Sequence, residues 1–127
     1  MHKFRFLILS LLLALTFSLG ACSKPEKKIG GHLEKMAEIM NDNASSPADG
    51  IDELREYLHK NLPEMAEQIG QLIVELEGMD DEAEIKERLK QIKENLDESM
   101  KTFEKASGEF MVKAMGDEKA QKKIAEI

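Results

Sequence analysis

Histidine and methionine residues recur at one-turn intervals in one stretch of this chain, and they have the clearest capacity for chemistry. His32, Met36 and Met40 are four residues apart, so a helix would place them on one face. Imidazole and thioether groups are ligands for Cu(I), which makes a copper carrier one interpretation of the spacing. Methionine also fills gaps in helical cores, and this second interpretation makes Met36 and Met40 packing residues. Without a metal, His32 and His59 are expected to be surface residues.

Other parts of the sequence offer little for catalysis. The chain has one cysteine and no two histidines four residues apart, so the zinc patterns are missing. A calcium loop centred on Gly50 fails, because Pro47 would occupy a position that needs an oxygen ligand. The many carboxylates are expected to lie on solvated surfaces with ordinary pKa values. We therefore expect no enzymatic activity.

The first 21 residues have the layout of an export signal. Lys3 and Arg5 precede an almost wholly apolar run of 14 residues, 6–19, and the small residues Gly20 and Ala21 follow it. A basic start, a short apolar stretch and small residues at the cleavage point are typical of secretory signals. The run is shorter than the roughly 20 residues that cross a bilayer. The pattern therefore predicts a cleaved leader.

Cys22, the only cysteine, directly follows this leader. The run Leu19-Gly20-Ala21-Cys22 resembles the lipobox of bacterial lipoprotein precursors. The resemblance implies that the Cys22 thiol carries a diacylglyceryl group, that the leader is cut before it, and that two or three acyl chains anchor the protein. This covalent lipid is the only expected cofactor. Ser23 in place of Asp implies the periplasmic face of the outer membrane, if the source is Gram-negative.

The remaining body is acidic and suited to helices. Removing residues 1–21 takes two of the 18 basic residues and none of the 25 acids, which leaves a net charge of −9. This charge argues against nucleic acid as a partner. The body has few aromatic or β-branched residues, so its core must come from Leu, Ile, Met and Ala. We expect an all-α fold, an antiparallel helical hairpin within a three- to four-helix bundle.

The helical pattern gives a simple domain organisation. We expect a signal peptide at 1–21, a lipidated tether at 22–30 and a helical bundle at 31–127. Within the bundle, apolar spacing and turn residues predict helices at 31–42, 47–77, from Asp80 to about 115, and 117–127. The stripe of the second helix keeps its phase across Pro63, which favours one kinked helix over two. Ser107-Gly108 is a candidate kink or break in the third.

The third helix has the longest apolar stripe. Its members are Ile85, Leu89, Ile92, Leu96, Met100, Phe103, Ala106, Phe110 and Ala114. Such a seam can pack within the chain, against a second copy or against a partner helix. We therefore expect a lipid-anchored structural, adaptor or protein-interaction module of the cell envelope. The alternatives are a copper carrier using His32, Met36 and Met40, and an acidic inhibitor or immunity-type protein.

The body also resembles short helical lipoproteins of uncharacterised function. The resemblance covers residues 31–62: a small helix, an Asn/Asp/Ser/Pro turn and the start of a long acidic amphipathic helix. It implies no activity.

Overall fold

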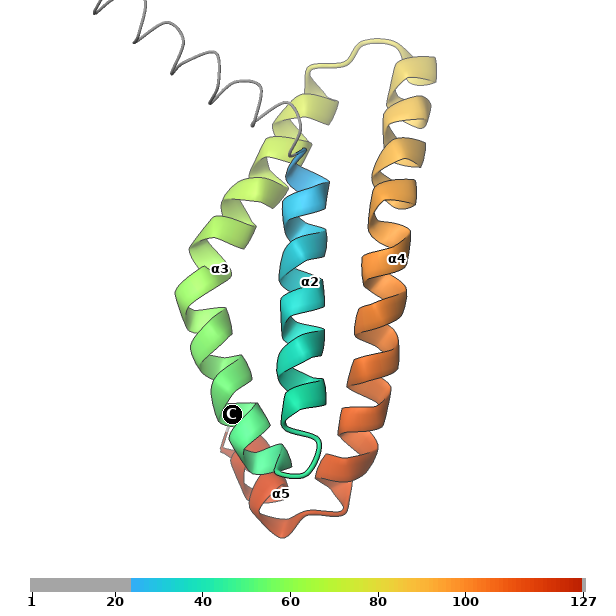
Figure 1. Cartoon of the computed structure of the whole chain (residues 1–127). Coiled ribbons are helices and arrows are strands. Elements are labelled where there is room, and N and C mark those ends of the chain that lie inside the picture. The colour runs from blue at the N-terminus through green and yellow to red at the C-terminus, as the bar shows by residue number, and fades with distance from the viewer. Residues whose placement is uncertain (1–23, 127) are drawn as a thin grey trace, which may run out of the picture.

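A computed structural model describes residues 24–126, and in this part of the chain the structure is a bundle of four helices without strands (Figure 1). The helices are α2 (Pro25–Asp42), α3 (Pro47–Glu77), α4 (Glu82–Met115) and α5 (Glu118–Ala125). The predicted all-α bundle is confirmed.

The two long helices run antiparallel, and α2 lies between them on one side (Figure 1). Helix α2 packs extensively against both α3 and α4, whereas α3 and α4 touch each other much less. The short α5 packs against α3 and α4 but not against α2. Helix α5 therefore lies against the two long helices, apart from α2 and at the lower end of the bundle in Figure 1.

Helix α2 begins earlier than the sequence predicted. Residues 25–30, expected to be part of a tether, form its first turns, and Gly30-Gly31 lies inside the helix. Pro25 suits the first helical position, and Glu26 in the first turn complements the helix dipole. Gly30 is needed for packing rather than for a break, since a Cβ there would lie 2.8 Å from the Ser99 Oγ.

The other helix boundaries mostly follow the predictions. Helix α3 continues through Pro63, so the prediction of one helix is confirmed. Helix α4 is capped by Asp81, whose carboxylate accepts a bond from the Ala83 amide, so its cap lies one residue after the predicted start at Asp80. It also runs unbroken past Gly108. Asp117 caps α5 as expected.

The apolar core lies where all four helices meet. Small residues let the helix backbones approach closely here, and one aromatic ring fills the space between α3 and α4. The core residues are Ala37, Met40, Ile51, Ala106, Phe110, Ala114 and Ala120, with Leu54 and Phe103 packed against them.

Gly50 is tightly enclosed at this core and gives a first prediction. A Cβ there would lie 2.7 Å from the Phe110 ring and 2.9 Å from the Asn43 Cβ. We expect Gly50→Ala to lower the free energy of unfolding by about 1–3 kcal/mol through overpacking. Gly70→Ala in the same helix meets nothing within 4 Å, and it should raise stability by up to about 1 kcal/mol. Urea denaturation measures the free energy of unfolding of both variants. Equal changes for Gly50→Ala and Gly70→Ala would contradict the prediction.

Candidate functional site

The predicted lipidation site lies outside the described residues. Cys22 and the lipobox residues Leu19, Gly20 and Ala21 precede the part of the chain that the structure describes. Their roles stay predictions from the sequence. Among residues 24–126, no helix is long and apolar enough to span a membrane.

His32, Met36 and Met40 lie on one face of α2, as their spacing predicted, and all three are buried. His32 was expected at the surface, but it is only 9% exposed. Its Nδ1 lies 2.5 Å from the Tyr57 hydroxyl, and its Nε2 is 3.8 Å from a Glu64 oxygen. Burial of the Tyr57 hydroxyl, together with the charge of Glu64, raises the Tyr57 pKa. His59 is exposed, as expected.

A charged cluster joins three helices at the end of the bundle away from α5. Arg88 of α4 donates to both oxygens of Glu26 of α2, at 2.7 and 2.8 Å. It also donates to both oxygens of Glu75 of α3, at 2.6 and 3.2 Å. Asn95 adds a bond of 2.9 Å to Glu26. Glu26 is 0% exposed, so Arg88 fastens α2 between the two long helices.

Electrostatics keep both members of this pair charged. Burial of Glu26 opposes ionisation, but the hydrogen bonds from Arg88 and Asn95 and the charge of Arg88 outweigh it and lower the Glu26 pKa to about 2. The hydrogen bonds to Glu26 and Glu75 raise the Arg88 pKa despite burial. The expectation of solvated carboxylates with ordinary pKa values is wrong for Glu26. The cluster links helices; Glu75 is its exposed member, with 38% of its side chain accessible, and both of its oxygens accept bonds from Arg88.

This cluster sets the orientation of α4. The apolar stripe predicted for this helix, which could pack within the chain, against a second copy or against a partner helix, faces α2 only in part. Instead Arg88, Asn95 and Ser99 face α2, and Leu89 and Met100 are 49% and 42% exposed. Each of these two apolar residues directly follows one that faces α2, so it points about 100° further round the helix.

Helix α3 has the same arrangement. Gln68 is buried and donates to Glu64, while the next residue, Ile69, is 49% exposed. Exposed apolar residues therefore follow both long helices on the side opposite α2. We call these residues the open face; they are Leu58, Leu62, Ile69 and Ile73 of α3 and Leu89, Met100 and Met111 of α4.

Part of the open face forms a groove of about 510 Å³. Leu58 and Leu62 line one wall and Met111 the other, while Ile124 of α5 lies at one end. Phe110 and other core residues lie along its base. Arg55 and His59 are the ionisable side chains in the lining. The groove is therefore an apolar surface with basic groups at one edge, which suits apolar contact rather than catalysis.

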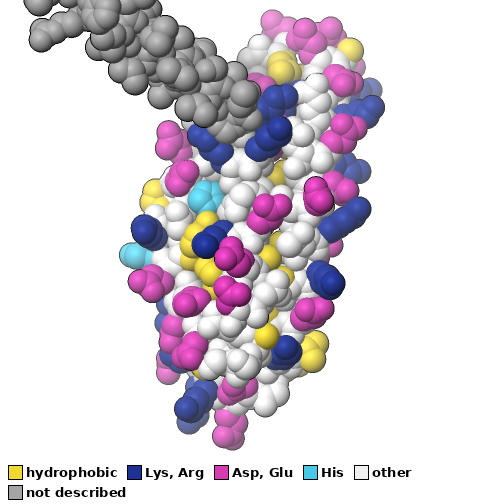
Figure 2. All heavy atoms as spheres, in the orientation of Figure 1, with side chains coloured by type: hydrophobic (Ala, Val, Ile, Leu, Met, Phe, Trp, Pro, Cys, Tyr) yellow, Lys and Arg dark blue, Asp and Glu magenta, His cyan; other side chains and the backbone are white. Residues whose placement is uncertain are grey.

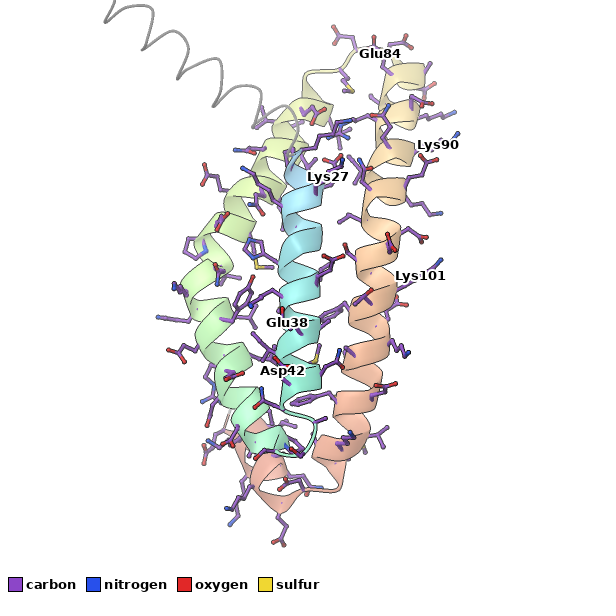
Figure 3. The ribbon with its side chains drawn as sticks, viewed as in Figure 1. Lys27, Glu38, Asp42, Glu84, Lys90 and Lys101 are labelled. Carbon is purple, nitrogen blue, oxygen red and sulfur yellow. The ribbon has the colours of Figure 1, made fainter. Side chains whose placement is uncertain are left out.

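The side of the molecule that α2 covers is different in character. Figure 2 shows charged side chains spread over this side, with acidic groups gathered at the end formed by the α3–α4 connection. In Figure 3, Lys90 and Lys101 of α4 point away from the bundle. The two sides therefore differ, since a long row of exposed apolar side chains belongs to the open face.

Comparisons of the chain with protein families, with curated protein sequences and with solved structures return no match. Within residues 24–126, no three His, Cys, Asp or Glu side chains are grouped closely enough to hold a metal ion. Sequence reasoning placed most of the open face on the apolar stripes of the two long helices, without an assigned partner. These residues are Leu58, Leu62, Ile69, Leu89 and Met100, whereas Ile73 and Met111 were missed.

Proposed function

We propose that this protein is an interaction module of the cell envelope, anchored by lipid on Cys22, and that it binds protein through the open face. The observation that supports the proposal is the row of seven exposed apolar side chains along two helices of a charged, acidic chain. Extended apolar patches on soluble domains commonly mark interaction sites.

The geometry of the open face suits a helical partner. It runs along α3 and α4, and α3 alone is about 46 Å long at 1.5 Å per residue. Two helices with a furrow between them accept the apolar stripe of another helix. The half-buried residues Leu72, Ile92 and Leu96 lie between the exposed rows, so a helix laid there would meet apolar side chains along its length.

The anchor gives this module its place. Lipid on Cys22 would hold the bundle at the periplasmic surface of the outer membrane, and the acidic charge would keep the body soluble beside the bilayer. The support is the lipobox pattern Leu19-Gly20-Ala21-Cys22 and the basic, apolar leader before it.

Crosslinking in intact cells tests the use of the open face. Ile69→Glu and Met100→Glu place charges on it, and each should reduce crosslinked product at least about tenfold, because burying an unpaired charge costs more than 1.4 kcal/mol. Val74→Glu and Val112→Glu are matched controls, since Val74 and Val112 are even more exposed, at 69% and 73%, but lie outside the open face.

Membrane extracts from the same cells test whether Cys22 carries the lipid anchor. The intact mass of chain extracted from membranes should equal residues 22–127 with acyl chains on Cys22. A free thiol or a retained leader would contradict the anchored part of the proposal. Equal crosslinking by the Ile69 and Val74 variants, at equal amounts of folded protein, would contradict the use of the open face.

A further inference from the structure

We infer that the open face binds a second copy of this chain, with the two copies antiparallel about a two-fold axis perpendicular to the long helices. The inference rests on the proposed function for the use of this face and adds the identity and direction of the partner. Four features support it: the position of α5, the charges at the two ends, the charges along α4 and the apolar pattern of α3.

Helix α5 restricts how two open faces meet. It packs against α3 and α4 but not α2, and Ile124 lines the groove, so it occupies one end of the open face. Two copies packed in the same direction would bring both α5 helices to the same place. Reversing one copy separates them and sets each α5 against the opposite end of the other copy. Steric fit therefore favours the antiparallel arrangement.

The charges at the two ends favour the same arrangement. The α3–α4 connection and its flanks are acidic, with Glu77, Asp80, Asp81 and Glu82. Around α5 the charge is balanced, with Lys119, Lys122 and Lys123 offset by Asp117, Glu118 and Glu126, and Lys123 already bonds Asp52. An antiparallel pair brings each acidic end to the lysines of the other copy, while a parallel pair brings two acidic ends together. Opposite charges at a rim speed association and set direction.

The edge of α4 beside the open face has a self-complementary charge pattern. Lys86 and Lys93 lie towards the α3–α4 connection, and Asp97 and Glu104 lie towards α5. A two-fold axis near Asn95 places Lys86 level with Glu104 of the second copy, and Lys93 level with its Asp97. Asp97 already bonds Lys101 at 3.0 Å, so Lys93 would be a second cation beside it.

The apolar pattern of α3 is self-complementary about nearly the same level. An axis near Ala66 places Leu62 against Ile69 of the second copy, and Leu58 against its Ile73. Two contacts fix how far α3 and α4 are shifted along their axes relative to each other. They are the Glu75–Arg88 bond and the close approach of Gly50 to Phe110.

Counting along both helices from these two contacts places Ala66 level with residues 94–97 of α4. The axis required by the charges of α4 and the axis required by the side chains of α3 therefore agree. Two adjacent helices, each about 10 Å wide and about 46 Å long, present a face of roughly 900 Å², close to the about 800 Å² per partner of a standard interface.

A single cysteine at the axis tests the partner and its direction. Ala66 is exposed at the edge of the open face, and in the antiparallel pair the two copies of residue 66 are neighbours. We expect Ala66→Cys in the full chain, oxidised mildly in intact cells, to form a disulfide-linked species of twice the chain mass that reductant removes. Lys101→Cys, whose side chain points away from the bundle in Figure 3, and the parent chain with Cys22 should yield at least about tenfold less.

Three other outcomes of the Ala66→Cys experiment would overturn the inference, and they separate it from the proposed function. A disulfide between Ala66→Cys and a different protein would overturn the second copy while supporting an interaction module. A dimer through Lys101→Cys of equal yield would show that another surface pairs. With Ala66→Cys as helical as the parent by circular dichroism, absence of any linked species would overturn the antiparallel pair. Leu58→Cys chains mixed with Ile73→Cys chains should form a disulfide-linked dimer, whereas neither variant alone should form one. This result would support the pairing of Leu58 with Ile73 of the second copy.

Discussion

Arg88→Met should lower the free energy of unfolding by about 3–5 kcal/mol, because it leaves the Glu26 carboxylate buried without its cation. Glu26 is fully buried, and Arg88 supplies two of the three side-chain hydrogen bonds that reach it. The variant also removes the bonds to Glu75 that join α4 to α3. Urea denaturation followed by far-ultraviolet circular dichroism measures the change.

Two further variants show whether the loss comes from an unpaired charge. Glu26→Leu combined with Arg88→Met removes both charges, and it should recover most of the stability, because apolar replacements of a whole buried pair are often neutral. Lys90→Ala changes an outward-pointing cation of the same helix (Figure 3) and should alter stability by less than about 0.5 kcal/mol. A double variant as unstable as Arg88→Met would contradict this explanation.

The second large effect is a loss of stability in acid that depends on Glu26. Its folded pKa is about 2, below its ordinary value of 4.5. The unfolded chain therefore takes up the proton first as pH falls. The stabilisation is fully present above about pH 4.5 and is lost as pH falls towards 2. Each unit of pKa difference corresponds to about 1.4 kcal/mol, so the total is about 3 kcal/mol.

Glu26→Gln isolates this contribution from those of the other carboxylates. The difference in unfolding free energy between the parent and this variant should be largest near neutral pH and should shrink by about 3 kcal/mol between pH 4.5 and 2. Arg88, Asn95 and Glu75 form the surrounding cluster. A difference that stays constant across this range would show that ionised Glu26 is not specifically stabilised in the fold.

Local patterns in the sequence predict most of the helices correctly. The stripe from Ile51 to Leu76 keeps one phase across Pro63, and the structure has one helix there. Proline and glycine misled the prediction near Pro25 and Gly30-Gly31. Pro25 starts a helix, and Gly30 provides space for Ser99 of α4. That contact joins residues far apart in the sequence, so spacing within α2 does not reveal it.

The candidate site was only partly predictable for the same reason. The spacing of His32, Met36 and Met40 correctly placed them on one face of a helix. The role of Arg88 depends on Glu26, which is 62 residues away along the chain. This long-range ion pair fixes the rotation of α4 and so exposes Leu89 and Met100. A basic residue immediately before an apolar stripe position was the available signal, and it is a weak one among so many charged residues.

The early start of α2 has a consequence for how the protein would rest at a membrane. Ser23 and Lys24 alone separate Cys22 from Pro25, and the three Cα–Cα steps from Cys22 to Pro25 span at most about 11 Å. An acylated Cys22 would thus hold the first turn of α2 close to the lipid headgroups. In an antiparallel pair these first turns lie on opposite outer sides, and both reach one bilayer only when the rotation axis stands along the membrane normal. The paired rods would then lie lengthwise along the lipid surface instead of projecting from it.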